Sequence, residues 1–136
     1  MFMDGQKRKI LIVDDDTFLL DMYAIKFSQN NFEVHTAVGG VQSVEKLKAG
    51  LAPDIILMDL IMPEMDGFEM LEKINMEKLS PDSVKIVLSN KSQQADIERA
   101  TTLGAAGYIV KANSTPVEVV EQVIAILNKK VLTEKK

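Results

Sequence analysis

Short apolar runs alternate with longer mixed stretches along this 136-residue chain. The apolar runs are rich in Ile, Val, Leu and Met, which is typical of strands covered on both faces of a sheet. They predict strands at 9–13, 33–37, 54–58, 84–88 and 107–110. The mixed stretches have the roughly 10 to 16 residues of ordinary globular helices. They predict helices at 17–30, 41–49, 66–76, 93–103 and 116–130.

Turn and capping residues stand at the ends of these elements. Gly104 follows the fourth predicted helix, where a C-terminal glycine is favoured. Thr115 precedes Pro116, and Glu118 comes three residues after Thr115, so the spacing predicts an N-cap, a proline at the first helical position and a capping box. Alternating strands and helices imply a parallel sheet with right-handed crossovers. The expected fold is a doubly wound α/β sandwich in one domain.

Charged residues stand where three of the predicted strands end. Asp14 and Asp15 follow the first strand, Asp59 follows the third, and Lys111 follows the fifth. Because the carboxyl ends of parallel strands converge on one crevice, we expect these side chains to lie together. Clustered carboxylates favour a hard divalent cation such as Mg2+, and a lysine beside them can neutralise an arriving phosphoryl group.

Composition excludes several other classes of function. The chain has no cysteine, which removes disulfides, thiolate nucleophiles and zinc-thiolate sites, and His35 alone cannot build a histidine-rich metal site. A net charge of -4 gives no general attraction to nucleic acid, so no direct nucleic-acid binding is expected. No apolar run approaches the ~20 residues that span a membrane. A cytoplasmic protein without membrane contact is the expectation.

Four segments, in order, resemble the receiver domains of two-component response regulators, the flavodoxin-like group that includes CheY. They read ILIVDDD, PDIILMDLIMPEMDG, IVLS and GAAGYIVK, and they occupy 10–16, 53–67, 86–89 and 104–111. Each segment alone is weak, but four in order at strand ends are highly specific. The resemblance covers 9–130, with tails expected at 1–8 and 131–136, and it implies a five-stranded sheet in the order 2-1-3-4-5 with five helices. The short remainder after 130 suggests a stand-alone regulator.

The resemblance also implies a role for each acid. Asp59 corresponds to the phosphoacceptor, and it would also contact the metal. Asp15 corresponds to a direct ligand of Mg2+, with Mn2+ as a substitute, and Asp14 to a partner acting through water. The backbone carbonyl of Ile61 would complete the protein ligands. Asp16 is expected to begin the first helix and to interact with its dipole rather than with metal.

Other residues correspond to phosphoryl-binding and switch positions. Lys111 would pair with one phosphoryl oxygen, and the hydroxyl of Ser89 would donate to another. Tyr108 matches an aromatic rotamer switch coupled to Ser89, although strand packing alone would also explain it. The phosphoryl donor would be a sensor histidine kinase or a phosphotransfer protein. Phosphorylation would then switch the surface of helix four, strand five and helix five for a downstream protein target or a homodimer.

Two further groups of residues are candidates for tuning and docking. Ile61 stands two residues after Asp59, and Lys91 stands two residues after Ser89. In the family, side chains at these two positions border the path of the water that hydrolyses the aspartyl phosphate. An apolar residue and a lysine there predict slow loss of phosphate. The first helix carries more apolar residues than one buried stripe requires, so partner contacts are expected at Phe18, Leu19, Met22 and, in the fourth helix, Ile97.

The chain departs from the family pattern after two of its motifs. Ala112 follows Lys111 where a proline with a cis peptide is usual, so a cis bond there is in doubt. Asn90 follows Ser89 where a small residue is usual, and this could narrow access to the phosphoryl group. Serine in place of the commoner threonine keeps the hydroxyl.

Two other classes of function remain open on the sequence. A haloacid-dehalogenase-type enzyme also uses an aspartyl nucleophile with Mg2+, but it requires a second Asp two residues later, and Ile61 stands there; Asp14 and Asp16 alone offer that spacing. The second class is an unphosphorylated pseudo-receiver that acts as an interaction module. Its signature is loss of an acid or of the lysine, and all are present. The favoured reading is therefore a phosphoacceptor domain with only self-phosphorylation and self-dephosphorylation chemistry, not an enzyme.

Overall fold

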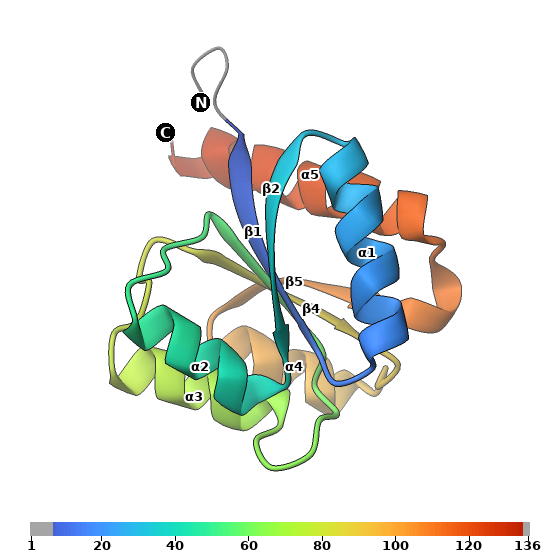
Figure 1. The fold of residues 1–136 in the computed structure, drawn as a ribbon. Coiled ribbons are helices and arrows are strands. Elements are labelled where there is room, and N and C mark those ends of the chain that lie inside the picture. Colours follow the sequence, from blue (N-terminus) through green and yellow to red (C-terminus); the bar gives the residue numbers. More distant parts are fainter. Residues whose placement is uncertain (1–6, 135–136) are drawn as a thin grey trace.

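The computed structural model describes residues 7–134, and the side chains of 7–130. Strands and helices alternate along the chain (Figure 1). The strands are β1 (Arg8–Asp14), β2 (Phe32–Val38), β3 (Ile55–Met58), β4 (Val84–Ser89) and β5 (Ala105–Val110). The helices are α1 (Thr17–Gln29), α2 (Gly40–Lys48), α3 (Gly67–Met76), α4 (Gln94–Thr102) and α5 (Pro116–Glu134), with a short 3-10 turn, η1 (Lys111–Asn113), before α5.

The strands form one parallel sheet in the order β2-β1-β3-β4-β5, which confirms the expected topology. Helices α1 and α5 cover one face of the sheet, and α2, α3 and α4 cover the other (Figure 1). All five strands therefore end at the same edge, where the loops that follow β1, β3, β4 and β5 meet. This edge is where the charged strand-end residues were expected to gather.

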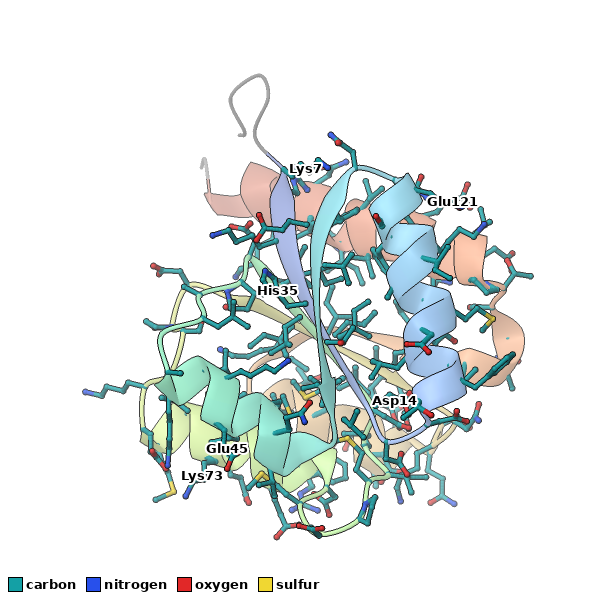
Figure 2. All side chains as sticks on the ribbon, viewed as in Figure 1. Lys7, Asp14, His35, Glu45, Lys73 and Glu121 are labelled. Atoms are coloured by element: carbon teal, nitrogen blue, oxygen red, sulfur yellow. The ribbon has the colours of Figure 1, made fainter. Side chains whose placement is uncertain are left out.

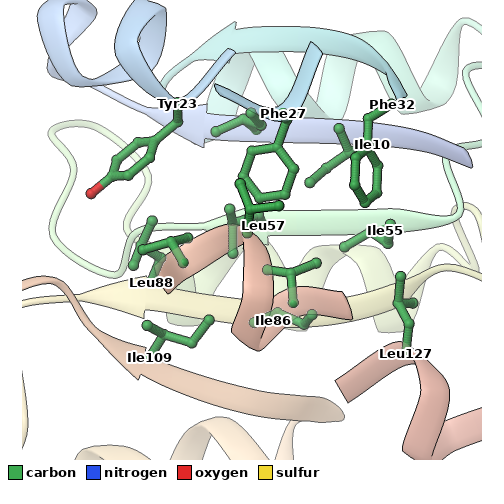
Figure 3. Close-up of a cluster of buried hydrophobic side chains, with 14 of the residues drawn as sticks. Ile10, Tyr23, Phe27, Phe32, Ile55, Leu57, Ile86, Leu88, Ile109 and Leu127 are labelled. Carbon is green, nitrogen blue, oxygen red and sulfur yellow. The ribbon is translucent and has the colours of Figure 1, made fainter. Parts of the chain in front are cut away.

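Each face of the sheet has its own hydrophobic core. On the α1 and α5 side, Ile10, Leu57 and Ile86 pack against helix residues such as Phe27 and Leu127 (Figure 3). The other face is built by side chains that alternate with these along the strands, including Leu11, Ile56 and Val87. Burial on both faces explains why the strands read as continuous apolar runs.

Element boundaries agree with the predicted ones to within two residues, with one exception. Helix α5 continues to Glu134, four residues beyond the predicted end at Lys130, so the expectation of a tail from 131 was wrong for 131–134. The run Val131-Leu132-Thr133-Glu134 contains no glycine or proline that would stop a helix. Strand β1 begins at Arg8, one residue inside the expected N-terminal tail, and 1–6, 135 and 136 lie outside the described residues.

Side-chain caps begin three of the helices. Asp16 is the N-cap of α1, and its carboxylate accepts hydrogen bonds from the N–H groups of Phe18 and Leu19. Asp66 caps α3 in a capping box. Thr115 does the same for α5, which confirms that prediction. None of the helices in the described part of the chain combines the length and the apolar character needed to cross a bilayer.

Candidate functional site

Three charged side chains meet at the carboxyl edge of the sheet. Asp14 ends β1, Asp59 directly follows β3, and Lys111 directly follows β5. Figure 2 shows Asp14 at the end of β1, beside the start of α1. The ammonium group of Lys111 donates to Asp14 Oδ2 at 2.7 Å and to Asp59 Oδ2 at 2.8 Å. All three side chains are almost fully buried, since even that of Lys111 is only 9% exposed. The lysine thus links two acids 45 residues apart in the sequence.

Asp15 brings a third carboxylate to the same place, but on the exposed side. Ligand oxygens of Asp14, Asp15 and Asp59 all lie within 4.8 Å of one another. Three hard oxygen donors at this spacing fit a small divalent cation such as Mg2+ or Mn2+. The structure thus brings together the acids that the sequence singled out for metal binding.

The charges at this edge shift one another's pKa values. Burial raises the pKa of Asp14, and the hydrogen bonds from Lys111 and from the Asp16 N–H only partly offset this. Burial alone would lower the pKa of Lys111, but its hydrogen bonds to Asp14 and Asp59 outweigh burial and raise that pKa. Lys111 therefore stays charged. The negative charge on Asp14 is held at a cost in free energy, which a bound cation would relieve.

Backbone groups orient the Asp59 carboxylate. Its Oδ1 accepts hydrogen bonds from the N–H of Leu60 at 2.7 Å and from the N–H of Ile61 at 3.2 Å, while Oδ2 faces Lys111. Helix α3 packs directly against this loop, because a Cβ added to Gly67 would lie 2.5 Å from the carbonyl oxygen of Asp59. The glycine at the start of α3 is thus required by a close approach of two backbones.

A chain of contacts runs from Ser89 to Tyr108. Ser89 is fully buried at the end of β4, and its hydroxyl oxygen accepts a hydrogen bond from the N–H of Lys91 at 3.2 Å. The carbonyl of Lys91 in turn accepts a hydrogen bond from the Tyr108 hydroxyl at 2.6 Å. The Tyr108 ring is partly buried against the core on the α2–α4 side. The predicted switch residues are therefore connected through the loop after β4.

Ile61 and Lys91 line one shallow cavity of about 400 Å³ beside the loop that follows Asp59. The Ile61 residue is 57% exposed. The Lys91 ammonium lies 3.6 Å from Asp96 Oδ1 in α4, so an acid that sequence reasoning did not single out holds it. Asp96 stands five residues after Lys91, so the two side chains can meet across the start of α4. This short spacing was the signal for the contact in the sequence.

The candidate partner residues differ in exposure. Phe18 is 75% exposed, whereas Leu19 and Met22 are half-buried and pack against the core on the α1 and α5 side. Ile97 in α4 is half-buried. Ile25, which the prediction left out, is 59% exposed on α1. The excess of apolar residues in α1 is therefore only partly a surface feature.

Comparison with known proteins identifies the family of this chain. The model of the response regulator receiver domain matches residues 10–124. The chain belongs to the response regulator receiver family. Over 127 residues, the receiver is 34% identical to the chemotaxis protein CheY of Treponema pallidum, covering 91% of this chain and 85% of that one. It is 39% identical over 105 residues to CheY of Thermotoga maritima, covering 76% and 85% respectively.

Solved structures agree with the fold. The receiver superposes on a CheY-like receiver domain protein from Methanospirillum hungatei with a TM-score of 0.82 and 26% identity, covering 94% of this chain and 99% of that one. The chain is thus a two-component response regulator receiver with a CheY-like fold. Phosphorylation and Mg2+ binding are typical of this family.

The carboxylate of Asp16 caps α1 instead of joining the acidic cluster, so Asp14 and Asp16 do not form the acid pair of a haloacid-dehalogenase-type site. The Lys111–Ala112 peptide is trans, as are the other peptide bonds of the described residues.

A buried tyrosine beneath the site was missed. Burial raises the pKa of Tyr23, whose hydroxyl also interacts electrostatically with Lys111, Asp14 and Asp59. Its spacing from Leu20 and Phe27 places it on the buried face of α1, which was the available signal.

Proposed function

We propose that this receiver accepts a phosphoryl group on Asp59 from a histidine kinase or a phosphotransfer protein, in a reaction that requires Mg2+ or Mn2+. The observation that carries the proposal is the bridge from Lys111 to both Asp59 and Asp14, with Asp15 beside them. A buried cation that already faces the acceptor carboxylate can compensate charge on an incoming phosphoryl group, and charge compensation is the main requirement of phosphoryl transfer.

The transfer converts a phosphoramidate into an acyl phosphate. A carboxylate oxygen of Asp59 bonds to phosphorus as the P–N bond of the donor phosphohistidine breaks, and the imidazole leaves with a proton. The N–H groups of Leu60 and Ile61 orient the carboxylate through Oδ1. Lys111 then exchanges a carboxylate partner for a phosphoryl oxygen, and the Ser89 hydroxyl donates to a second phosphoryl oxygen.

Asp15, Asp59 and the backbone carbonyl of Ile61 would hold the metal, with Asp14 as a partner through water. A bound divalent cation would reduce repulsion between the phosphoryl oxygens and the acidic cluster. The burial that raises the pKa of Asp14 supports this assignment, because a cation beside that carboxylate offsets the cost of its charge.

The output is a change of surface, not turnover of a substrate. Once Ser89 turns to the phosphoryl group, its hydrogen bond with the Lys91 N–H is disturbed, and the Lys91 carbonyl is the acceptor of the Tyr108 hydroxyl. The face of α4, β5 and α5 then favours a downstream protein or a second copy of the chain. In this role the receiver acts in the cytoplasm, without direct nucleic-acid contact, and catalyses only its own phosphorylation and dephosphorylation.

Intact-mass spectrometry with acetyl phosphate tests the acceptor. We expect a phosphoryl adduct on the wild-type protein with Mg2+, and none with EDTA or in Asp59→Asn. Asp82→Asn, which changes an exposed acid far from the site, should be phosphorylated like wild type. An adduct that persists in Asp59→Asn, or forms equally in EDTA, would contradict the assignment.

A further inference from the structure

A second cavity lies at the opposite edge of the sheet from Asp59. It has a volume of about 400 Å³, and it is formed by the starts of β4 and β5 and by α5, with Lys85, Gly104, Ala106 and Lys130 among its lining residues. Lys85 and Ser89 lie on the same strand four residues apart, roughly 13 Å at the usual strand rise. This cavity is therefore separate from the phosphorylation site.

Lys85 is the unusual group in this cavity. Lys85 is half-buried. Its ammonium group nevertheless has neither a hydrogen-bond acceptor nor an ion-pair partner among the residues that the structure describes. Asp82, the acid that lines the same cavity, forms no ion pair with it. Buried lysines are ordinarily paired, since an unpaired charge loses hydration without compensation.

Burial lowers the pKa of Lys85, and the positive charge of Lys130 lowers it further. A lower pKa means that a larger fraction of the amine is neutral at a given pH. The neutral amine is the nucleophile, and desolvation together with a neighbouring cation is a known way to activate a lysine.

We propose that Lys85 is a covalent modification site that takes an acyl group from small acyl phosphates. The Nζ lone pair attacks the carbonyl carbon of the donor, and the C–O bond to the phosphate breaks. Phosphate leaves, the amine proton passes to water, and a neutral amide remains on Lys85. The cavity admits a donor of this size, and the positive charge of Lys130 attracts its phosphate end.

The product also fits the cavity better than the starting lysine. Acylation removes a charge that is partly desolvated and that Lys130 repels. Because the folded-state pKa of Lys85 is lowered, its charge opposes folding in full at pH values below that pKa, and the opposition is lost as the pH rises from that pKa to the ordinary pKa of a lysine. The acylated protein should therefore be at least as stable as the unmodified one.

Competitive labelling with limiting acetyl phosphate tests the proposal. The experiment uses the full chain carrying Asp59→Asn, in EDTA, so that phosphorylation does not interfere, and peptide mass spectrometry gives the acetylation rate of each lysine. We expect Lys85 to react several-fold faster than the exposed Lys78, and its rate to level off at lower pH than that of Lys78. Equal or slower acetylation of Lys85 would overturn the proposal.

Two variants and a second reagent sharpen the result. Lys130→Gln should slow acetylation of Lys85, because it raises the pKa of the amine and removes the attraction for phosphate, whereas Lys129→Gln on the same helix should not. A neutral acetyl ester measures the reactivity of the amine alone, and Lys85 should remain the faster lysine. If Lys85 reacts fast with the neutral ester but not with acetyl phosphate, the proposed donor class is wrong. If Lys130→Gln does not change the acetylation rate of Lys85, the proposed role of Lys130 is wrong.

Discussion

Lys111 holds the two buried acids of the site in place. Its ammonium lies within 2.8 Å of a carboxylate oxygen of each, while Asp15 stays exposed at the entrance. Asp14 and Asp59 already share the ammonium group of Lys111. Asp15 is therefore the carboxylate best available to a metal ion from solution. The neighbouring Asp16 has a different task, because its carboxylate is engaged by the first N–H groups of α1.

Removal of the Asp15 carboxylate should weaken Mg2+ binding far more than removal of the Asp16 carboxylate. Asp15→Ala deletes an oxygen ligand of the acidic cluster. Asp16→Ala deletes a helix cap and should lower the free energy of unfolding by about 1 kcal/mol. Calorimetric Mg2+ titration and urea unfolding of both variants separate the two effects. Equal losses of Mg2+ affinity would mean that the acidic pair is assigned in the wrong register.

The phosphorylated form should lose its phosphate slowly. Ile61 offers no side-chain hydrogen bond to a water, and Lys91, held near Asp96, borders the same cavity, so an attacking water is poorly positioned. Ile61→Asn and Lys91→Glu should each speed phosphate release from the purified phosphoprotein several-fold. Lys129→Glu, a remote charge change, serves as the control. Unchanged or slower release in both variants would show that these side chains do not limit water access.

The start of α3 positions the loop that follows Asp59. The N–H of Gly67 donates to the carbonyl of Leu60 at 2.9 Å, and the helix can come this close only because Gly67 has no side chain. Gly107 in β5 is also tightly packed, but its nearest neighbour is the end of the flexible Ile126 side chain. The two glycines therefore differ in what must move when a methyl group is added.

Gly67→Ala should destabilise the protein more than Gly107→Ala. A methyl group at position 67 meets the backbone of Asp59 and Leu60, which cannot move without disturbing the site, and overpacking of this kind costs about 1–3 kcal/mol. At position 107 a rotation of Ile126 relieves most of the clash. Urea unfolding gives both free energies, and phosphorylation by acetyl phosphate should slow only in Gly67→Ala. A larger loss in Gly107→Ala would contradict this packing argument.

A short series of contacts joins the site to the expected output face. The hydroxyl oxygen of Ser89 accepts a hydrogen bond from the N–H of Lys91, and the carbonyl of Lys91 accepts one from the Tyr108 hydroxyl. The side chain of Lys91 in turn reaches Asp96 on α4. A phosphoryl group shifts the protein between conformations only through different contacts in the two states, and the expected new contacts with Ser89 and Lys111 supply that difference.

Beryllofluoride with Mg2+, which mimics the phosphoryl group, should therefore perturb backbone amide NMR signals well beyond Asp59. The changes should extend to Tyr108 in β5 and to Ile97 in α4, while amides at the start of β4 and the end of α5 should change little. Tyr108→Phe, which removes only the hydroxyl bonded to Lys91, should reduce the perturbation at Ile97. Changes confined to the acidic pocket in the wild-type protein would contradict the proposed coupling.

Local patterns in the sequence predict the elements and the residues that gather at the site. Apolar runs, helix caps and the glycine after α4 act over a few residues, so they predict strands and helices locally, and a parallel sheet then brings Asp14, Asp59 and Lys111 to one edge. Motif order specified the family for the same reason, since each motif lies within one strand and its loop.

How those residues pair depends on the packing of the elements against one another. The double hydrogen bond of Lys111, the close approach at Gly67 and the half-buried Lys85 beside Lys130 all join residues from different elements. Even the stacking of Arg99 on Phe68 at 4.1 Å links α4 with α3. Such pairs depend on where packed helices bring long, flexible side chains. No pattern within a single segment of sequence contains that information.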